Sequence, residues 1–208
     1  FDQLRGDDVP PGGTLTNVSV IDSLAFLVGR VGVDFVTNTT PQSQILDLSP
    51  FINRTNKLVR SHTGELEWDW GAGKLTVNAP AAQGVSGFLS TLGTVELEDV
   101  RIESSLDYGT ILLVALDGKP IAASGKLLLQ VTSEELPYEW ATSQPSGVRT
   151  INNRGTVPLL VKNFAGTVRL KRPDAAAMTV VPVDYNGYRL SGTPGHADLI
   201  QLASESAY

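Results

Sequence analysis

The alternation of apolar and polar residues over residues 65–79 predicts a β-hairpin. Leu66, Trp68 and Trp70 alternate with acidic residues, and the alternation resumes after a glycine-rich turn at residues 71–73. Because successive side chains of a strand point to opposite faces, the two tryptophans should share one face. A buried face would make them part of a core, and an open face would make them a platform for a ligand.

Similar short strands recur along the rest of the chain, separated by Gly, Pro, Asn and Asp. The connections are short, which favours antiparallel pairing. The sequence therefore predicts an all-β fold, an antiparallel β-sandwich of jelly-roll type with one or two short helices. Residues 1–20 are expected to be a lead-in or linker, and residues 21–208 a single sandwich domain. The clearest expected strands cover residues 30–36, 57–62, 110–116, 126–132, 166–172 and 197–203.

Several local patterns give finer predictions. Residues 21–28 and 174–178 are the expected short helices. Between the pairs Val95/Leu97 and Val100/Ile102 the apolar positions change parity, which predicts a β-bulge near Asp99. The stretch 110–116 is continuously apolar, as in a central strand covered on both faces.

Two further segments stand out as turns or loops. Residues 185–188, Tyr-Asn-Gly-Tyr, predict a hairpin with a two-residue type I′ turn. Residues 134–157 contain Pro and Gly without a clear period, and read as a long irregular excursion. Such long loops are commonly functional or disordered.

Composition excludes several classes of function. The net charge of −6 argues against a nucleic-acid surface, which requires clustered Lys and Arg. The longest apolar run is far shorter than the roughly 20 residues of a membrane helix, so no membrane partner is expected. Without cysteine the chain has no disulfide, thiolate metal site or cysteine nucleophile. Its first residues resemble neither an initiator Met nor a signal peptide, so we expect a piece of a longer protein.

No constellation of residues predicts catalysis strongly. Glu65 and Glu67 lie at a spacing that glycosidic chemistry can use, with Asp69 beyond them, but acids on the outer face of a strand are usually only solvated. His62 and His196 lack the glycine-flanked serine that a hydrolytic triad of this kind uses. We therefore expect a chain without catalytic residues.

No cofactor is expected, although a structural calcium ion is conceivable. Loop carboxylates are suitable ligands for calcium, but none of those present follows the spacing of an ordered calcium loop. The loop carboxylates concerned are Asp7, Asp8, Asp184 and Asp198.

Aromatic residues are the best candidates for carbohydrate contact, because sugar rings stack on flat side chains. Tyr138 and Trp140 lie on the long excursion and are the preferred external platform. Trp68 and Trp70 fit a core better than a platform, since Leu66 shares their face. The remaining candidates are Tyr185 and Tyr188, which flank the Asn-Gly turn and could simply pack across it.

Four segments carry a resemblance to a known family. Residues 58–70 (LVRSHTGELEWDW), 74–88 (KLTVNAPAAQGVSGF), 115–130 (ALDGKPIAASGKLLLQ) and 166–170 (GTVRL) resemble the C-terminal β-sandwich domain that follows the (β/α)8 catalytic barrel of large bacterial glycoside hydrolases. The similarity covers about residues 26–205. It implies that the catalytic carboxylates lie on the barrel and not in this chain.

The resemblance leads to a first functional hypothesis. The chain would be a non-catalytic accessory domain of a secreted, polysaccharide-degrading bacterial enzyme, outside the cell or in its envelope. Its partners would be a polysaccharide or oligosaccharide and the catalytic domain of the same parent chain. Two alternatives remain open: a small glycosidase that uses the carboxylates of residues 65–69, and a structural or surface-assembly protein whose edge strands pair with neighbours.

Overall fold

The computed structural model describes residues 22–32, 37, 47–144, 147–163, 165–184, 186–191 and 195–203. Their secondary structure is mostly strand with one short α-helix, and the strand pairs are antiparallel, so the predicted all-β, sandwich-like class is confirmed. Contacts divide the chain into two units, Phe1–Gly71 and Ala72–Tyr208. The expectation of a single domain over residues 21–208 stays a prediction.

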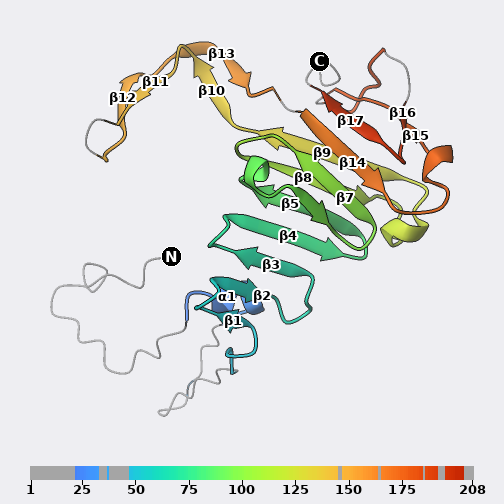
Figure 1. Ribbon diagram of the computed structural model, residues 1–208, viewed down its shortest axis with the longest axis horizontal. Helices are drawn as coiled ribbons and strands as arrows, with labels where there is room; N and C mark the ends of the chain where they lie inside the picture. Colours follow the sequence, from blue (N-terminus) through green and yellow to red (C-terminus); the bar gives the residue numbers. More distant parts are fainter. Residues whose placement is uncertain are drawn as a thin grey trace. The chain divides into compact units, whose positions relative to one another are not determined.

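The described residues of the first unit form a short helix and three short strands. Helix α1 spans Ala25–Val28, and strands β1, β2 and β3 span Ile52–Asn53, Leu58–Arg60 and Leu66–Asp69 (Figure 1). The Asp22 carboxylate accepts a hydrogen bond from the Leu24 N–H just before the helix. The predicted helix and the predicted strand over residues 57–62 are therefore both present in shortened form. Most of the strand expected at residues 30–36 lies outside the described residues.

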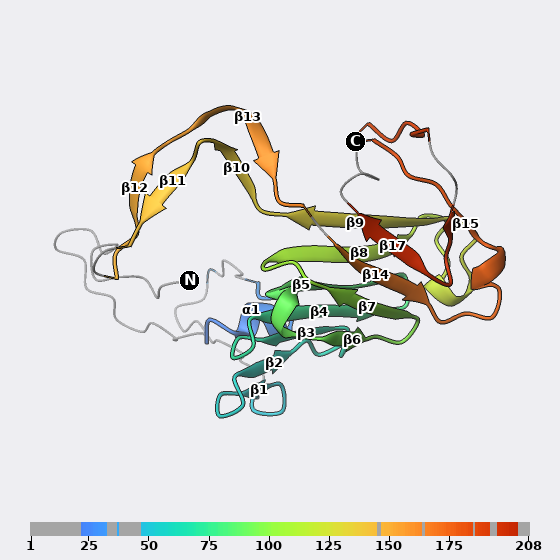
Figure 2. The ribbon, with the colours of Figure 1, turned by 45° about the horizontal axis from the view of Figure 1, so that its top comes forward.

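The described residues of the second unit form two main sheets (Figures 1 and 2). One sheet contains, in this order, β4 (Lys74–Ala79), β5 (Ala82–Gly87), β8 (Gly109–Ala115) and β9 (Leu127–Ser133). The other contains, in this order, β6 (Thr94–Glu96), β7 (Val100–Ser104), β14 (Ala165–Leu170) and β17 (Ile200–Ala203). The strands predicted near residues 110–116, 126–132, 166–172 and 197–203 are all confirmed.

Short elements connect and flank these sheets. They are the 3-10 turns η2 (Leu89–Thr91), η3 (Ile121–Ala123) and η4 (Ala175–Ala177), and the paired strands β15 (Thr179–Val180) and β16 (Gly195–His196). The helix expected over residues 174–178 is the single turn η4.

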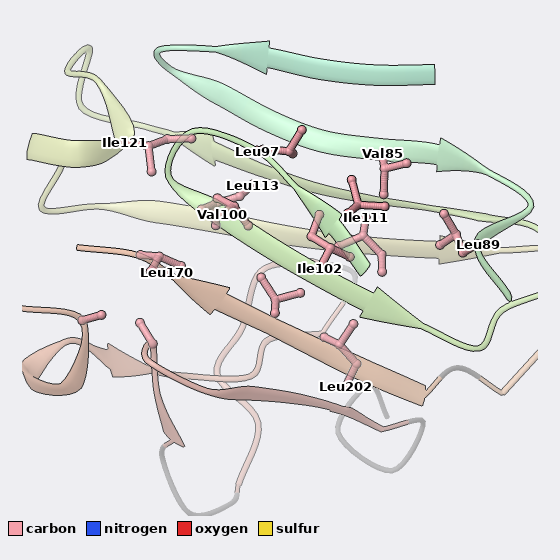
Figure 3. Packing of buried hydrophobic residues seen from close by; sticks show 14 of the residues in the cluster. Val85, Leu89, Leu97, Val100, Ile102, Ile111, Leu113, Ile121, Leu170 and Leu202 are labelled. Atoms are coloured by element: carbon pink, nitrogen blue, oxygen red, sulfur yellow. The ribbon is translucent and has the colours of Figure 1, made fainter. Parts of the chain in front are cut away.

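The core contains side chains from the inner faces of both sheets (Figure 3). Ile111 on β8, Val100 on β7 and Val168 on β14 are completely buried. Burying one such side chain contributes about 1.5–3 kcal/mol, so the core supplies most of the favourable free energy. On β8 the other face, with Leu112 and Val114, is only half-buried. Strand β8 is therefore central in its sheet, as predicted, but deeply buried on one face only.

A hairpin turn, and not the predicted β-bulge, explains the change of parity near Asp99. Val95 lies opposite Ile102, and the Leu97 N–H donates to the Val100 carbonyl over 2.9 Å. In this register, across a two-residue turn, an odd-numbered residue of β6 lies opposite an even-numbered residue of β7. All four apolar side chains therefore face the core without an extra residue in either strand.

The turn at residues 184–188 also differs from the prediction. Asp184 N–H donates to the Tyr188 carbonyl, and the Asp184 carbonyl accepts from Gly187 N–H, both over 2.9 Å. A two-residue Asn-Gly turn would instead place residue 185 opposite Tyr188. The loop is therefore one residue longer, and Gly187, with φ of +82°, supplies the left-handed conformation it requires.

A buried glutamine connects the two sheets of the second unit. Gln83 on β5 is fully buried, and its Nε2 donates to the Asp99 carboxylate over 2.8 Å. Its Oε1 accepts the Asp99 N–H over the same distance. The side chain thereby satisfies its own polar atoms and holds the β6–β7 turn against the opposite sheet.

Two further polar groups hold the loop between β8 and β9. The Asp117 carboxylate accepts hydrogen bonds from the Ser124 hydroxyl (2.8 Å) and the Gly125 N–H (2.9 Å). The Arg172 guanidinium donates to the carbonyls of Ile121 and Ser124 over 2.8 and 2.7 Å. These contacts fix the loop that places Ile121 in the core.

Candidate functional site: the β10–β13 arm

The segment predicted to be irregular is a two-stranded antiparallel arm between β9 and β14 (Figures 1 and 2). Its inner part pairs β10 (Glu135–Tyr138) with β13 (Thr156–Val161), and its outer part pairs β11 (Ala141–Ser143) with β12 (Thr150–Asn153). The register shifts within both strand pairs, and glycines occupy the turns of the arm. These irregularities hide the strand period, which is why the excursion appeared structureless.

Lys162 fixes the base of the arm. Its backbone N–H donates to the Glu134 carbonyl, and the Ser133 hydroxyl donates to the Lys162 carbonyl. Its ammonium lies 2.7 Å from the Glu134 carboxylate and 3.2 Å from that of Asp107. Hydrogen bonds from Lys162 to Glu134 and then to Asp107 raise the pKa of the lysine above its ordinary value.

The inner arm exposes apolar side chains on both of its faces. Leu136 lies opposite Leu160, and Pro137 lies opposite Leu159, so the two pairs point to opposite faces. Leu159 is 57% exposed, and Leu136 and Leu160 are also exposed. A ribbon of two strands has no second layer with which to cover such residues.

The arm bends where β10 and β13 end. Glu139 and Gly155 both have positive φ angles, +63° and +66°, and the Trp140 N–H donates to the Pro137 carbonyl over 3.0 Å. A Cβ at position 155 would collide with the Tyr138 carbonyl oxygen and the Pro137 side chain. Only glycine fits here, so the bend is built into the backbone.

The outer arm is cationic and partly apolar. Arg149 and Arg154 are exposed, and no Asp or Glu occurs among residues 140–161. Removing these two positive charges from the net charge of −6 leaves −8 on the rest of the chain. Val148 and Ile151 add exposed apolar surface to this end.

Two of the predicted aromatic candidates lie at the bend of the arm. Tyr138 ends β10 and is 48% exposed, whereas Trp140 follows the bend and is half-buried. Tyr138 therefore offers an accessible ring, and Trp140 offers part of one.

The other predicted aromatics are placed elsewhere. Trp68 and Trp70 share one face of the chain, as predicted, with ring centroids 5.6 Å apart and ring planes inclined by 46°. Both are half-buried, which is intermediate between the expected core and an open platform. Tyr188 is exposed on its turn, and Tyr185 lies outside the described residues.

The structure also reveals an aromatic pair that sequence reasoning missed. Phe88 and Tyr108 are both about half exposed, and their rings meet edge to face with centroids 5.4 Å apart. They are distant in sequence and become neighbours because Gly87 pairs with Gly109 across β5 and β8. In the sequence, this pair could have been recognised from an aromatic residue directly beside the glycine at one end of each strand.

The acids considered for catalysis have structural partners. Glu67 accepts a hydrogen bond from Arg60 on the neighbouring strand over 2.5 Å, and Asp69 accepts the Gly71 N–H over 3.0 Å. Glu65 lies just before β3 and is half-buried.

Among the described residues no three His, Cys, Asp or Glu side chains are grouped as a metal site would require. Of the acids considered for calcium, Asp184 accepts the N–H groups of Asn186 and Tyr188 in its turn. Asp198 is exposed, and Asp7 and Asp8 lie outside the described residues.

Comparisons with known proteins found no match. No family model, no curated protein and no solved structure is significantly similar to this chain. Within the described part of the chain, no helix has the length and apolar character needed to cross a membrane. The resemblance to accessory domains of glycoside hydrolases therefore stays a prediction.

Proposed function

We propose that this chain is a non-catalytic structural module that joins protein chains through its β10–β13 arm. The observation that carries the proposal is the inner arm, whose apolar side chains point to both faces of an unsupported ribbon. Exposed apolar groups cost free energy in water, and a partner surface that covers them recovers it. The anchored base and the built-in bend support this role, because a pre-shaped arm loses little conformational entropy on docking.

The partner is a protein surface and not a glycan for reasons of chemistry. Protein interfaces contain buried aliphatic and aromatic anchors, and Leu136, Leu159 and Leu160 are suited to that role. Sugars require flat rings surrounded by polar groups. The inner arm offers one exposed ring, Tyr138, among aliphatic neighbours.

Site-specific photo-cross-linking in the cells that produce the protein tests this proposal. A photoreactive amino acid at Leu159 should form adducts with polypeptide, identified by mass spectrometry of the cross-linked peptides. The same residue at Lys119, on the exposed turn after β8, is the control. If position 159 yields no more peptide adducts than position 119, the arm does not dock on protein and the proposal fails.

The second candidate is the accessory domain of a secreted polysaccharide-degrading enzyme. Exposed Tyr138 and the half-buried pair of Trp68 and Trp70 favour it, since aromatic rings at the surface can stack on sugars. Retention of the chain on immobilised polysaccharides, reduced by Tyr138→Ala or Trp70→Ala, would support this candidate. Equal mobility in gels with and without each polysaccharide would remove it.

A further inference from the structure

Strand β9 is an open edge of its sheet. It pairs with β8, and no other strand of the described chain pairs with it. The Leu116 N–H donates to the Lys126 carbonyl, which fixes the pattern of hydrogen bonds along the β8–β9 pair. In an antiparallel pair these bonded positions alternate, so the backbone groups of Leu127, Leu129 and Val131 point to the open edge.

This edge lacks two of the usual protections against strand addition, charged residues and proline. Its sequence, Leu-Leu-Leu-Gln-Val-Thr-Ser, contains no charged residue and no proline. The side chains of Leu127, Leu129 and Val131 pack against the core but remain half-buried. An added strand would satisfy the free backbone groups and deepen the burial of these residues.

Strand β13 of the arm has the complementary properties. The Lys162 N–H donates to the Glu134 carbonyl just beyond the end of β13. Because bonded positions alternate along an antiparallel pair, the even-numbered residues of β13 face β10, and the backbone groups of Leu159 and Val161 point away from it. The same bond holds β13 beside β10, and β13 is not paired with β9 of its own chain. A donor strand and an acceptor edge therefore occur in one molecule without pairing within it.

From this we infer that the arm of one copy adds β13 to the β9 edge of a second copy, and reciprocally, in a closed dimer. The inference rests on the proposed function and names the partner. Charge supports a second copy, because the outer arm carries two arginines and no acid whereas the rest of the chain has a net charge of −8. Since β9 leads directly into the arm, one two-fold axis can satisfy both exchanges together.

Light scattering of the purified 208-residue chain provides the first test. The expected mass is twice the chain mass of 22.2 kDa. Leu159→Glu should weaken association by at least about tenfold, because a carboxylate would be buried at the contact. Tyr188→Glu, at an exposed position outside the arm, should leave the dimer intact. A single-chain mass at every concentration up to about a millimolar, a value in the range of weak association, would overturn the inference.

Cysteine cross-linking tests the geometry, because the chain contains no cysteine of its own. Chains with Leu159→Cys are mixed with differently tagged chains carrying Gln130→Cys, an exposed position on β9. A short bis-maleimide should join the two tags, whereas Lys119→Cys in place of Gln130→Cys should not be joined. Equal yields for both mixtures would contradict strand addition at β9.

The outcomes separate this inference from the function on which it rests. A monomer in solution, together with peptide adducts from other proteins at position 159 in cells, overturns the second-copy partner and leaves protein docking intact. Absence of both association and adducts overturns both. A dimer that cross-links at β9 supports both.

Discussion

Individual polar side chains connect the two main sheets of the second unit. Gln83 is the clearest case, because it is fully buried and both ends of its amide are satisfied by Asp99. Removing one partner from such a pair leaves a buried group without a hydrogen bond, which costs more than the bond itself contributes.

We predict that Gln83→Ala lowers the free energy of unfolding by about 2–4 kcal/mol, from the lost hydrogen bonds and the cavity left behind. Chemical denaturation monitored by circular dichroism measures the change. Gln201→Ala, at an exposed position on β17, is the matched control and should change stability by less than about 0.5 kcal/mol. Equal effects of the two substitutions would contradict the role assigned to Gln83.

The Asp117 carboxylate makes the fold sensitive to acid. The hydrogen bond from Ser124, and then that from Gly125, holds the pKa of Asp117 below its ordinary value. The folded state thus favours the ionised form, so this stabilisation is complete above the ordinary pKa. It is lost as the pH falls below about 4, through the lowered pKa of the folded state.

Asp117→Asn should therefore destabilise the protein at pH 7, and the gap between variant and parent should narrow as the pH falls towards about 3. Melting temperatures measured across this range check the prediction. Asp198→Asn, at an exposed turn, is the control and should follow the parent. A gap that is constant with pH would show that Asp117 acts through shape and not through its charge.

At the scale of elements, the geometry of the turn between β6 and β7 decided how these two strands are connected, which the strand period of the sequence left open. The apolar positions of β6 and β7 each follow the strand period, but the change of parity between them fits either a bulge or a two-residue turn. A bulge keeps one continuous strand, whereas the turn makes two strands that pair with each other. Only the pairing of Val95 with Ile102 distinguishes them, and this contact is a property of the folded chain.

The bend in the arm depends on one glycine. Gly155→Ala should disrupt the bend, because the new Cβ would collide with the backbone of Tyr138 and the φ of +66° disfavours any other residue. Hydrogen exchange should become faster in residues 137–157 while the melting temperature changes little. Gly147 also has a positive φ, but a Cβ at this position would meet no neighbouring atom. Gly147→Ala is therefore the control, because it introduces backbone strain without a collision. Equal exchange rates in both variants would contradict the steric account.

At the scale of the whole molecule, the arm is a separate element attached to a self-sufficient core. The buried cluster between the sheets of the second unit contains no residue of the arm. Stability should therefore come from the sandwich and association from the arm.

Replacing residues 139–155 by Asn-Gly, which would connect the paired residues Tyr138 and Thr156, tests whether the outer arm contributes to stability. The melting temperature of the monomer should change by less than about 3 °C, which corresponds to roughly 1 kcal/mol for a chain of this size. Circular dichroism on heating measures it. A loss of cooperative unfolding would show that the outer arm belongs to the folding unit.

The sequence by itself determined the all-β class, the main strands and the residues that share a face within each strand, because a period of two and short glycine-rich connections are local properties. It did not reveal the β10–β13 arm, the Phe88–Tyr108 pair or the open edge of β9. Shifts of register hide the strand pattern of the arm, and a strand carries no local mark of which neighbour it lacks. Only the tertiary structure decides which edges are paired and which surfaces are covered, since these depend on residues brought together from distant parts of the chain.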